Sequence, residues 1–150
     1  MSTYEYGYQG DFMNQIMNKL YEYGLHDTAI TRIKTETNKI VFFFANGIYK
    51  LNNLGKELFL TEKCSLIITV DSNISLNVFN MIDVQSFSCK GRKFVDSENI
   101  ESLVQNEKLE VHNVYYSCFN NTILLDVYDS KESYLIRIEN CKNIEYKFSV

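Results

Sequence analysis

The chain of 150 residues contains no proline and no tryptophan, and its six glycines are dispersed along the sequence. Because proline is absent, turns must be recognised from asparagine, glycine, aspartate and serine. The scattered glycines exclude a glycine-rich loop of the kind that cradles phosphate groups. There is therefore no sequence motif for binding a nucleotide.

Histidine and cysteine are scarce as well. The chain has two histidines, His26 and His112, which excludes a site built from several histidines, so a catalytic zinc would need carboxylate or thiolate ligands in addition. No two cysteines form a CxxC pair, which argues against a structural zinc or a thioredoxin-like redox site. The cysteines are Cys64, Cys89, Cys118 and Cys141. We therefore expect no metal ion and no cofactor.

Long apolar runs are missing too. No stretch reaches the roughly 18 apolar residues of a membrane span, and the first residues lack a basic region followed by an apolar core. The sequence thus predicts no membrane segment and no secretory signal. Four reduced, partly buried thiols in a cytoplasmic protein are the simplest expectation.

Positive charge is limited and spread out. The 15 Lys and Arg residues are outnumbered by 19 Asp and Glu residues, so the formal net charge is −4. Nucleic-acid binders usually carry a basic stripe that releases counterions. The densest positive cluster, residues 90–93, is expected to be a solvated turn. We therefore predict no nucleic-acid partner, while mild acidity suits a basic protein partner.

What the chain does have is alternation of apolar and polar residues. It is clearest in residues 144–150, where even positions are apolar and odd positions are polar. Strands send neighbouring side chains to opposite faces, so such segments bury one face and expose the other, as in antiparallel sheets. We expect strands at residues 28–36, 40–45, 48–51, 58–60, 64–71, 76–89, 109–118, 122–128, 134–139 and 143–148.

Two segments have helical spacing instead. The first begins after Asp11 as N-cap, carries Ile16 and Leu20 on its apolar face, and is predicted to end at Gly24. The second lies near residues 97–106. Between strands, Asn46-Gly47 predicts a type I′ turn, because Asn-Gly accepts positive φ at both positions.

These elements predict an α+β fold in one domain spanning residues 1–150. A mainly antiparallel, strongly curved β-sheet is expected to form a sandwich or half-barrel. The N-terminal helix covers one face or one open end, because its apolar stripe needs a partner and the sheet is the only large one available.

The pair His26-Asp27 lies between the first helix and the first strand. HD-type phosphohydrolases use such pairs to hold metals, but they require further histidines. The simpler interpretation is a structural turn, in which Asp27 bonds to the backbone and His26 packs beside it. A contact surface or a divergent active site is the alternative.

No nucleophile motif is present. The sequence has no Gly-x-Ser-x-Gly elbow, and no cysteine has a histidine close to it in sequence. Cys118 is six residues from His112 and on the same strand face by parity, but about 20 Å away along a regular strand. We therefore predict no catalytic residues.

Aromatic residues are plentiful: Tyr and Phe together supply 14% of the chain. Since residues 42–44 are all Phe, at least one of them must point away from a one-sided core. The candidates for an aromatic contact or pocket are Phe42, Phe44, Tyr115 and Tyr116. Tyr favours protein interfaces because it combines rigid contact area with a hydroxyl group. A second covered face or a homodimer contact would also account for them.

The junction Leu25-His26-Asp27-Thr28-Ala29-Ile30, followed by Ile33 and a strand at residues 40–44, resembles the start of several small β-rich bacterial families. Their members open with a helix and an HD turn and continue through successive strands, and some are assigned as immunity proteins of polymorphic-toxin systems. The resemblance covers the first 45 residues, the overall length and the C-terminal meander. It implies a cytoplasmic protein that blocks a toxin by occlusion, without catalytic residues.

The function predicted from the sequence is therefore a non-enzymatic protein-binding module whose partner is a protein, with a toxin as the specific expectation. A small-ligand carrier is the second hypothesis, in which the curled sheet encloses a pocket lined by Phe42, Phe44 and Tyr115. An enzyme is the third, and it would require carboxylates to converge on His26 or His112.

Overall fold

The computed structural model describes residues 15–74, 76–81, 93–95 and 97–148. Its strands form three antiparallel sheets. Sheet A has the order β1 (Tyr23–Gly24), β5 (Tyr49–Leu51), β6 (Glu57–Leu60). Sheet B has the order β2 (Ala29–Ile30), β10 (Leu109–Ser117), β11 (Thr122–Tyr128), β12 (Ser133–Ile138), β8 (Leu76–Met81), β9 (Lys93–Val95). Sheet C has the order β13 (Cys141–Phe148), β7 (Cys64–Val70), β4 (Lys39–Phe44), β3 (Arg32–Thr35).

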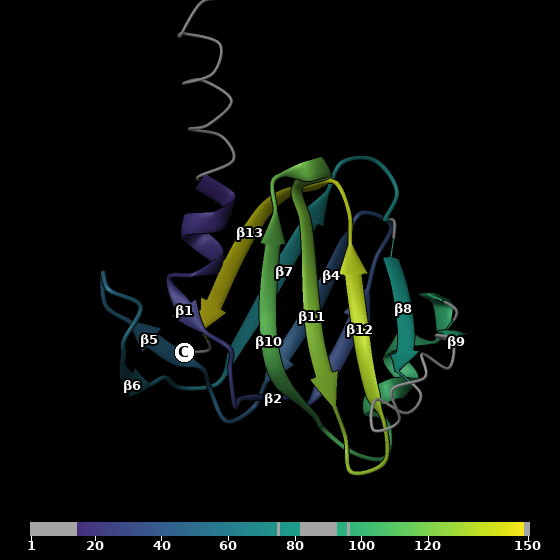
Figure 1. Ribbon diagram of the computed structural model, residues 1–150, viewed down its shortest axis with the longest axis horizontal. Coiled ribbons are helices and arrows are strands. Elements are labelled where there is room, and N and C mark those ends of the chain that lie inside the picture. Colours follow the sequence, from purple (N-terminus) through teal and green to yellow (C-terminus); the bar gives the residue numbers. More distant parts are fainter. Residues whose placement is uncertain (1–14, 75, 82–92, 96, 149–150) are drawn as a thin grey trace, which may run out of the picture.

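Sheets B and C face each other and are joined at one corner (Figure 1). The corner is Thr31, which separates β2 in sheet B from β3 in sheet C. Its backbone N–H donates to the Phe43 carbonyl at 2.8 Å, and its hydroxyl accepts from the Ala45 N–H at 3.3 Å. The expected single strand over residues 28–36 is therefore bent in two. This bend gives the predicted antiparallel, strongly curled half-barrel its shape.

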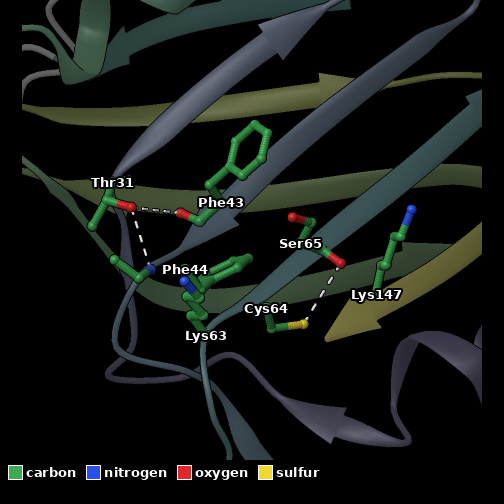
Figure 2. Close-up of a pocket in the computed structure, with 8 residues that line it drawn as sticks. Thr31, Phe43, Phe44, Lys63, Cys64, Ser65 and Lys147 are labelled. Carbon is green, nitrogen blue, oxygen red and sulfur yellow. Dashed lines mark hydrogen bonds between the residues drawn. The ribbon is translucent and has the colours of Figure 1, made fainter. Parts of the chain in front are cut away.

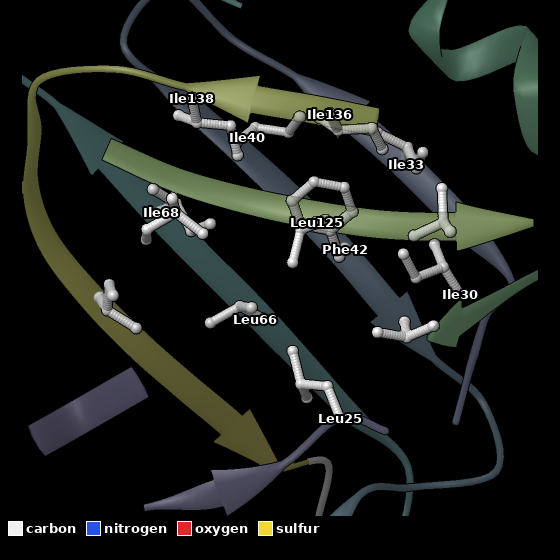
Figure 3. Packing of buried hydrophobic residues seen from close by; sticks show 14 of the residues in the cluster. Leu25, Ile30, Ile33, Ile40, Phe42, Leu66, Ile68, Leu125, Ile136 and Ile138 are labelled. Atoms are coloured by element: carbon white, nitrogen blue, oxygen red, sulfur yellow. The ribbon is translucent and has the colours of Figure 1, made fainter. Parts of the chain in front are cut away.

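The core fills the space between sheets B and C (Figure 3). Side chains alternate between buried and partly exposed along β4, β7 and β12, as the sequence pattern predicts. Phe42 from sheet C and Leu125 from sheet B lie in the middle of this layer. As expected, one of the three consecutive phenylalanines points away from the core. Phe42 and Phe44 point inward, and Phe43 lies on the outer face.

The N-terminal helix is shorter at its C-terminal end than predicted. Residues 15–20 are helical, with Ile16 and Leu20 buried, and the Tyr146 hydroxyl donates to the Leu20 carbonyl at 2.7 Å. The prediction that Gly24 ends the helix is wrong, because Tyr23 and Gly24 form β1 and pair with β5. Asp11, the expected N-cap, lies outside the described residues.

The second predicted helix is present as the 3₁₀ helix η1, Ser97–Val104, with Ile100 buried. Its Glu101 carboxylate accepts from the Thr35 backbone N–H at 2.8 Å, which ties η1 to β3. A second 3₁₀ turn, η2 (Phe119–Asn121), joins β10 to β11. Of the strand predicted over residues 76–89, β8 covers the first part, and residues 82–89 lie outside the described chain.

The turn after β4 is not of type I′. The Gly47 N–H donates to the Phe44 carbonyl at 3.1 Å, so the central residues are Ala45 and Asn46, neither of which has positive φ. Gly47 follows with φ 84°, and β4 and β5 belong to different sheets. A tight hairpin is excluded here, because the chain must leave sheet C to build sheet A.

Candidate functional site

The His26-Asp27 pair forms a tight turn between sheets A and B. The Thr28 N–H donates to the Leu25 carbonyl at 3.0 Å, and the Thr28 hydroxyl donates to the same oxygen. Asp27 adopts φ 61°, a left-handed conformation that Asp and Asn tolerate better than other non-glycine residues. The local sequence thus suits a turn with positive φ at its third residue.

This turn is hydrogen-bonded to an irregular point of β10. The Asp27 N–H donates to the Val111 carbonyl at 2.9 Å, and the Val111 N–H donates to the Thr28 carbonyl at 2.8 Å. The register of β10 against β11 shifts between Val111 and Asn113, which makes His112 the extra residue of a β-bulge. Its carbonyl accepts a hydrogen bond from Nδ1 of His26. The HD turn therefore holds the start of β2 against this bulge.

The side chains of the turn are exposed and contact one another. Nε2 of His26 lies 3.2 Å from a carboxylate oxygen of Asp27. Both ring nitrogens of His26 thus face oxygen atoms. The His112 ring lies 5.9 Å from the His26 ring and 6.5 Å from that of Tyr128, between centroids.

Metal binding and thiol reactivity are the two kinds of chemistry to consider among the described residues. Within the described part of the chain, no group of three or more His, Cys, Asp or Glu side chains is arranged to hold a metal ion. Burial raises the pKa of the Cys64 thiol to about 11 and that of Cys141 to about 12, so both remain protonated near neutral pH. The third described cysteine, Cys118, is exposed.

The four aromatic candidates do not come together. Phe42 and Phe44 are 0% and 1% exposed between the sheets, whereas Tyr115 is 49% exposed on the opposite, outer face of sheet B. Tyr116 packs against the core and donates its hydroxyl hydrogen to Oδ1 of Asn121 at 2.6 Å. Phe42, Phe44 and Tyr115 therefore line no common pocket, although Phe44 is among the residues that line the sheet C pocket described below.

Comparison with known proteins found no matching family model, no similar curated protein and no similar solved structure. Among the described residues, no helix is both long enough and apolar enough to cross a bilayer.

Two surface features were not identified from the sequence. The first is the β5–β6 hairpin, which exposes Leu54, Leu58, Phe59 and Leu60 by 92%, 57%, 59% and 53%. We call these four residues the hairpin patch. The available signal was the run Leu58-Phe59-Leu60, whose lack of alternation means that both faces of the strand are apolar.

The second is a pocket of about 310 Å³ on the outer surface of sheet C (Figure 2). Thr31, Phe43, Lys63, Cys64, Ser65 and Lys147 are among the residues that line it. They come from distant parts of the chain, so no local motif could reveal the pocket. It lies outside the barrel, unlike the interior pocket expected for a ligand carrier.

Proposed function

We propose that this protein is a non-enzymatic protein-binding module that contacts its partner through the hairpin patch. The observation that carries the proposal is the exposure of four large apolar side chains within seven residues. Apolar clusters of this kind commonly mark protein interaction sites. Covering one such side chain contributes about 1.5–3 kcal/mol.

The shape of β6 favours docking through side chains over addition of a strand. In the described chain β6 is an edge of sheet A. Its register against β5 shifts, because Leu51 pairs with Glu57 while Lys50 pairs with Phe59, which leaves Leu58 as the extra residue of a bulge. Bulges and charges on edge strands disfavour edge-to-edge pairing.

The surroundings of the patch resemble an interface rim. Lys56 and Glu57 lie between Leu54 and Leu58, and Glu62 and Lys63 follow Leu60, all of them exposed. An apolar centre with a charged rim is the usual anatomy of a protein interface. The hairpin is also anchored firmly, because the Thr61 N–H donates to the Ile48 carbonyl at 2.7 Å. A pre-positioned patch loses little conformational entropy on binding.

The partner class we propose is a toxin that is neutralised by occlusion. The support comes from the resemblance of the first 45 residues, the overall length and the C-terminal meander to the HD-turn families, and from the net charge of −4, which suits a basic partner. Two observations support the proposal that the protein is not an enzyme. His26 is hydrogen-bonded to the His112 carbonyl, and the buried thiols of Cys64 and Cys141 remain protonated near neutral pH.

The test is co-expression with the product of the neighbouring gene, followed by capture and titration calorimetry. Leu58→Lys and Phe59→Lys are each expected to weaken binding by about 10–150-fold, since each removes about 1.5–3 kcal/mol of apolar burial. The matched control is Phe119→Lys, which changes a single exposed aromatic residue in η2. Light scattering on the free protein shows whether a second copy covers the patch instead.

Equal weakening by all three variants would reject the hairpin patch as the contact surface. A dimer of the free protein that dissociates in Leu58→Lys, without any binding to the neighbouring gene product, would reject the heterologous partner.

A further inference from the structure

Three of the residues that line the pocket on sheet C, Phe43, Ser65 and Lys147, belong to one row of paired residues that crosses all four strands. Arg32 on β3 pairs with Phe43 on β4, Phe43 pairs with Ser65 on β7, and Ser65 pairs with Lys147 on β13. Directly opposite residues share a face, so all four side chains lie on the outer face of the sheet. With adjacent strands about 4.8 Å apart, the row spans about 14 Å between the Cα atoms of Arg32 and Lys147.

The hollow arises from the order of side-chain sizes along this row. Ser65 is small and lies between the bulky Phe43 and the long Lys147, which leaves a gap above the strand of Ser65 (Figure 2). Lys63, in the segment that leads into β7, lines the same pocket. On the far side of Phe43, the Arg32 guanidinium lies 5.3 Å from the centre of the phenyl ring. The result is an aromatic wall with cations at both ends.

Within the described part of the chain, no carboxylate pairs with the positive charges at this place. In the described chain, neither Lys63 nor Lys147 nor Arg32 has a carboxylate within 4 Å, and no acidic residue lines the pocket. Glu145 is on the same outer face but opposite Ile67, one step further along the strands. Three other lysines do have a carboxylate within 3.7 Å: Lys34, Lys50 and Lys108.

We propose that this pocket binds a small organic anion, with its apolar body against Phe43 and its anionic group between Lys63 and Lys147. The volume of about 310 Å³ lies at the lower end of the range for small-molecule sites, which is about 300–1,000 Å³. The ammonium groups of the two lysines that line the pocket suit a carboxylate, sulfonate or phosphate. A concave apolar floor favours a small molecule over the flat side of a protein. The site contains none of the four apolar residues of the hairpin patch, although Lys63 lies beside both.

The probe is anilinonaphthalene sulfonate, an aromatic anion that fluoresces when it leaves water. The double variant Lys63→Glu, Lys147→Glu is expected to weaken its binding by about tenfold or more, since two favourable charge contacts become unfavourable. Ser65→Leu fills the hollow without a change in charge and is expected to have a similar effect. The matched control, Lys56→Glu with Lys131→Glu, makes the same change in net charge at two exposed sites away from the pocket. Circular dichroism melts verify that each variant is folded.

The proposal is supported if the first two variants lose binding and the control keeps it. It is overturned if the natural sequence does not bind the probe, or if the control Lys56→Glu, Lys131→Glu loses as much binding as Lys63→Glu, Lys147→Glu. It is also overturned if, of all the variants, only the hairpin variant Leu58→Lys loses probe binding. Loss of partner capture in Lys63→Glu, Lys147→Glu with unchanged probe binding would also overturn it and would assign the lysines to a protein interface. Because the probe needs no partner, failure here leaves the hairpin proposal intact.

Discussion

Gly47 allows a sharp test of how the hairpin patch is held in place. A Cβ atom at this position would lie 2.0 Å from the Thr61 carbonyl oxygen and 2.9 Å from that of Glu62, at φ 84°. Gly55 has a similar φ of 76° but has no atom within 4 Å of such a Cβ. Gly47→Ala therefore adds a collision with the backbone to the conformational cost, whereas Gly55→Ala adds the conformational cost alone.

The expected magnitudes follow from this difference. Left-handed φ costs a non-glycine residue about 1–2 kcal/mol. Overpacking against atoms that cannot rotate away typically adds about 1–3 kcal/mol. Gly47→Ala is thus expected to lower the free energy of unfolding by about 2–5 kcal/mol and Gly55→Ala by about 1–2 kcal/mol. For a chain of this length, each 1 kcal/mol lowers the Tm by about 2–4 °C.

The assay is urea unfolding followed by circular dichroism, because the chain has no tryptophan to report by fluorescence. Any effect of alanine on the unfolded chain is shared by the two variants and cancels in the comparison. Equal destabilisation by Gly47→Ala and Gly55→Ala would refute the tight contact between Gly47 and Thr61. The hairpin would then be joined less rigidly to sheet C than the structure indicates.

Two further predictions concern the HD turn and the buried thiols. Asp27→Gly should leave the protein as stable as the natural sequence or more stable, because φ 61° suits glycine. Asp27→Ala should instead destabilise it by about 1 kcal/mol. Equal losses of stability for the two variants in thermal melts would show that the Asp27 carboxylate contributes more to stability than the backbone conformation does. Burial raises the pKa of Cys64 to about 11 and that of Cys141 to about 12, above the ordinary value of 9.0, so the folded state holds these protons more tightly than the unfolded state. Their contribution to stability is complete below pH 9 and is lost as the pH rises through 11 to 12. Cys141→Ala should therefore flatten the fall in stability above pH 9, and an unchanged slope would contradict the burial argument.

Much of the fold could be predicted because alternation is a local property. Residues 64–70 and 39–44 fold as alternating strands, and their inward faces follow directly from the period of two. The 3₁₀ helix near residues 97–104 could be found because its period differs from that of the strands around it.

The candidate sites could be predicted from alternation less well than the strands. His26 and Asp27 were identified as a turn, but the β10 bulge that they hold could not be. That bulge reverses the alternation, since Leu109 and Val111 face the core before it and Val114 and Tyr116 pack against the core after it. The parity that placed His112 and Cys118 on one face is therefore wrong. The change from apolar residues at 109 and 111 to apolar residues at 114 and 116 is the signal in the sequence that could have revealed the extra residue.

The sequence by itself determined which face of each regular alternating strand is buried, because hydrophobicity and period are properties of each segment alone. Only the tertiary structure decided which segments meet. It made β6 the edge of sheet A, with the hairpin patch exposed among the described residues. It also placed Phe43, Ser65 and Lys147 on three neighbouring strands, where they line the pocket. The hydrophobic pattern fixes which face of a strand is buried, but which strands become neighbours depends on the packing of the whole core.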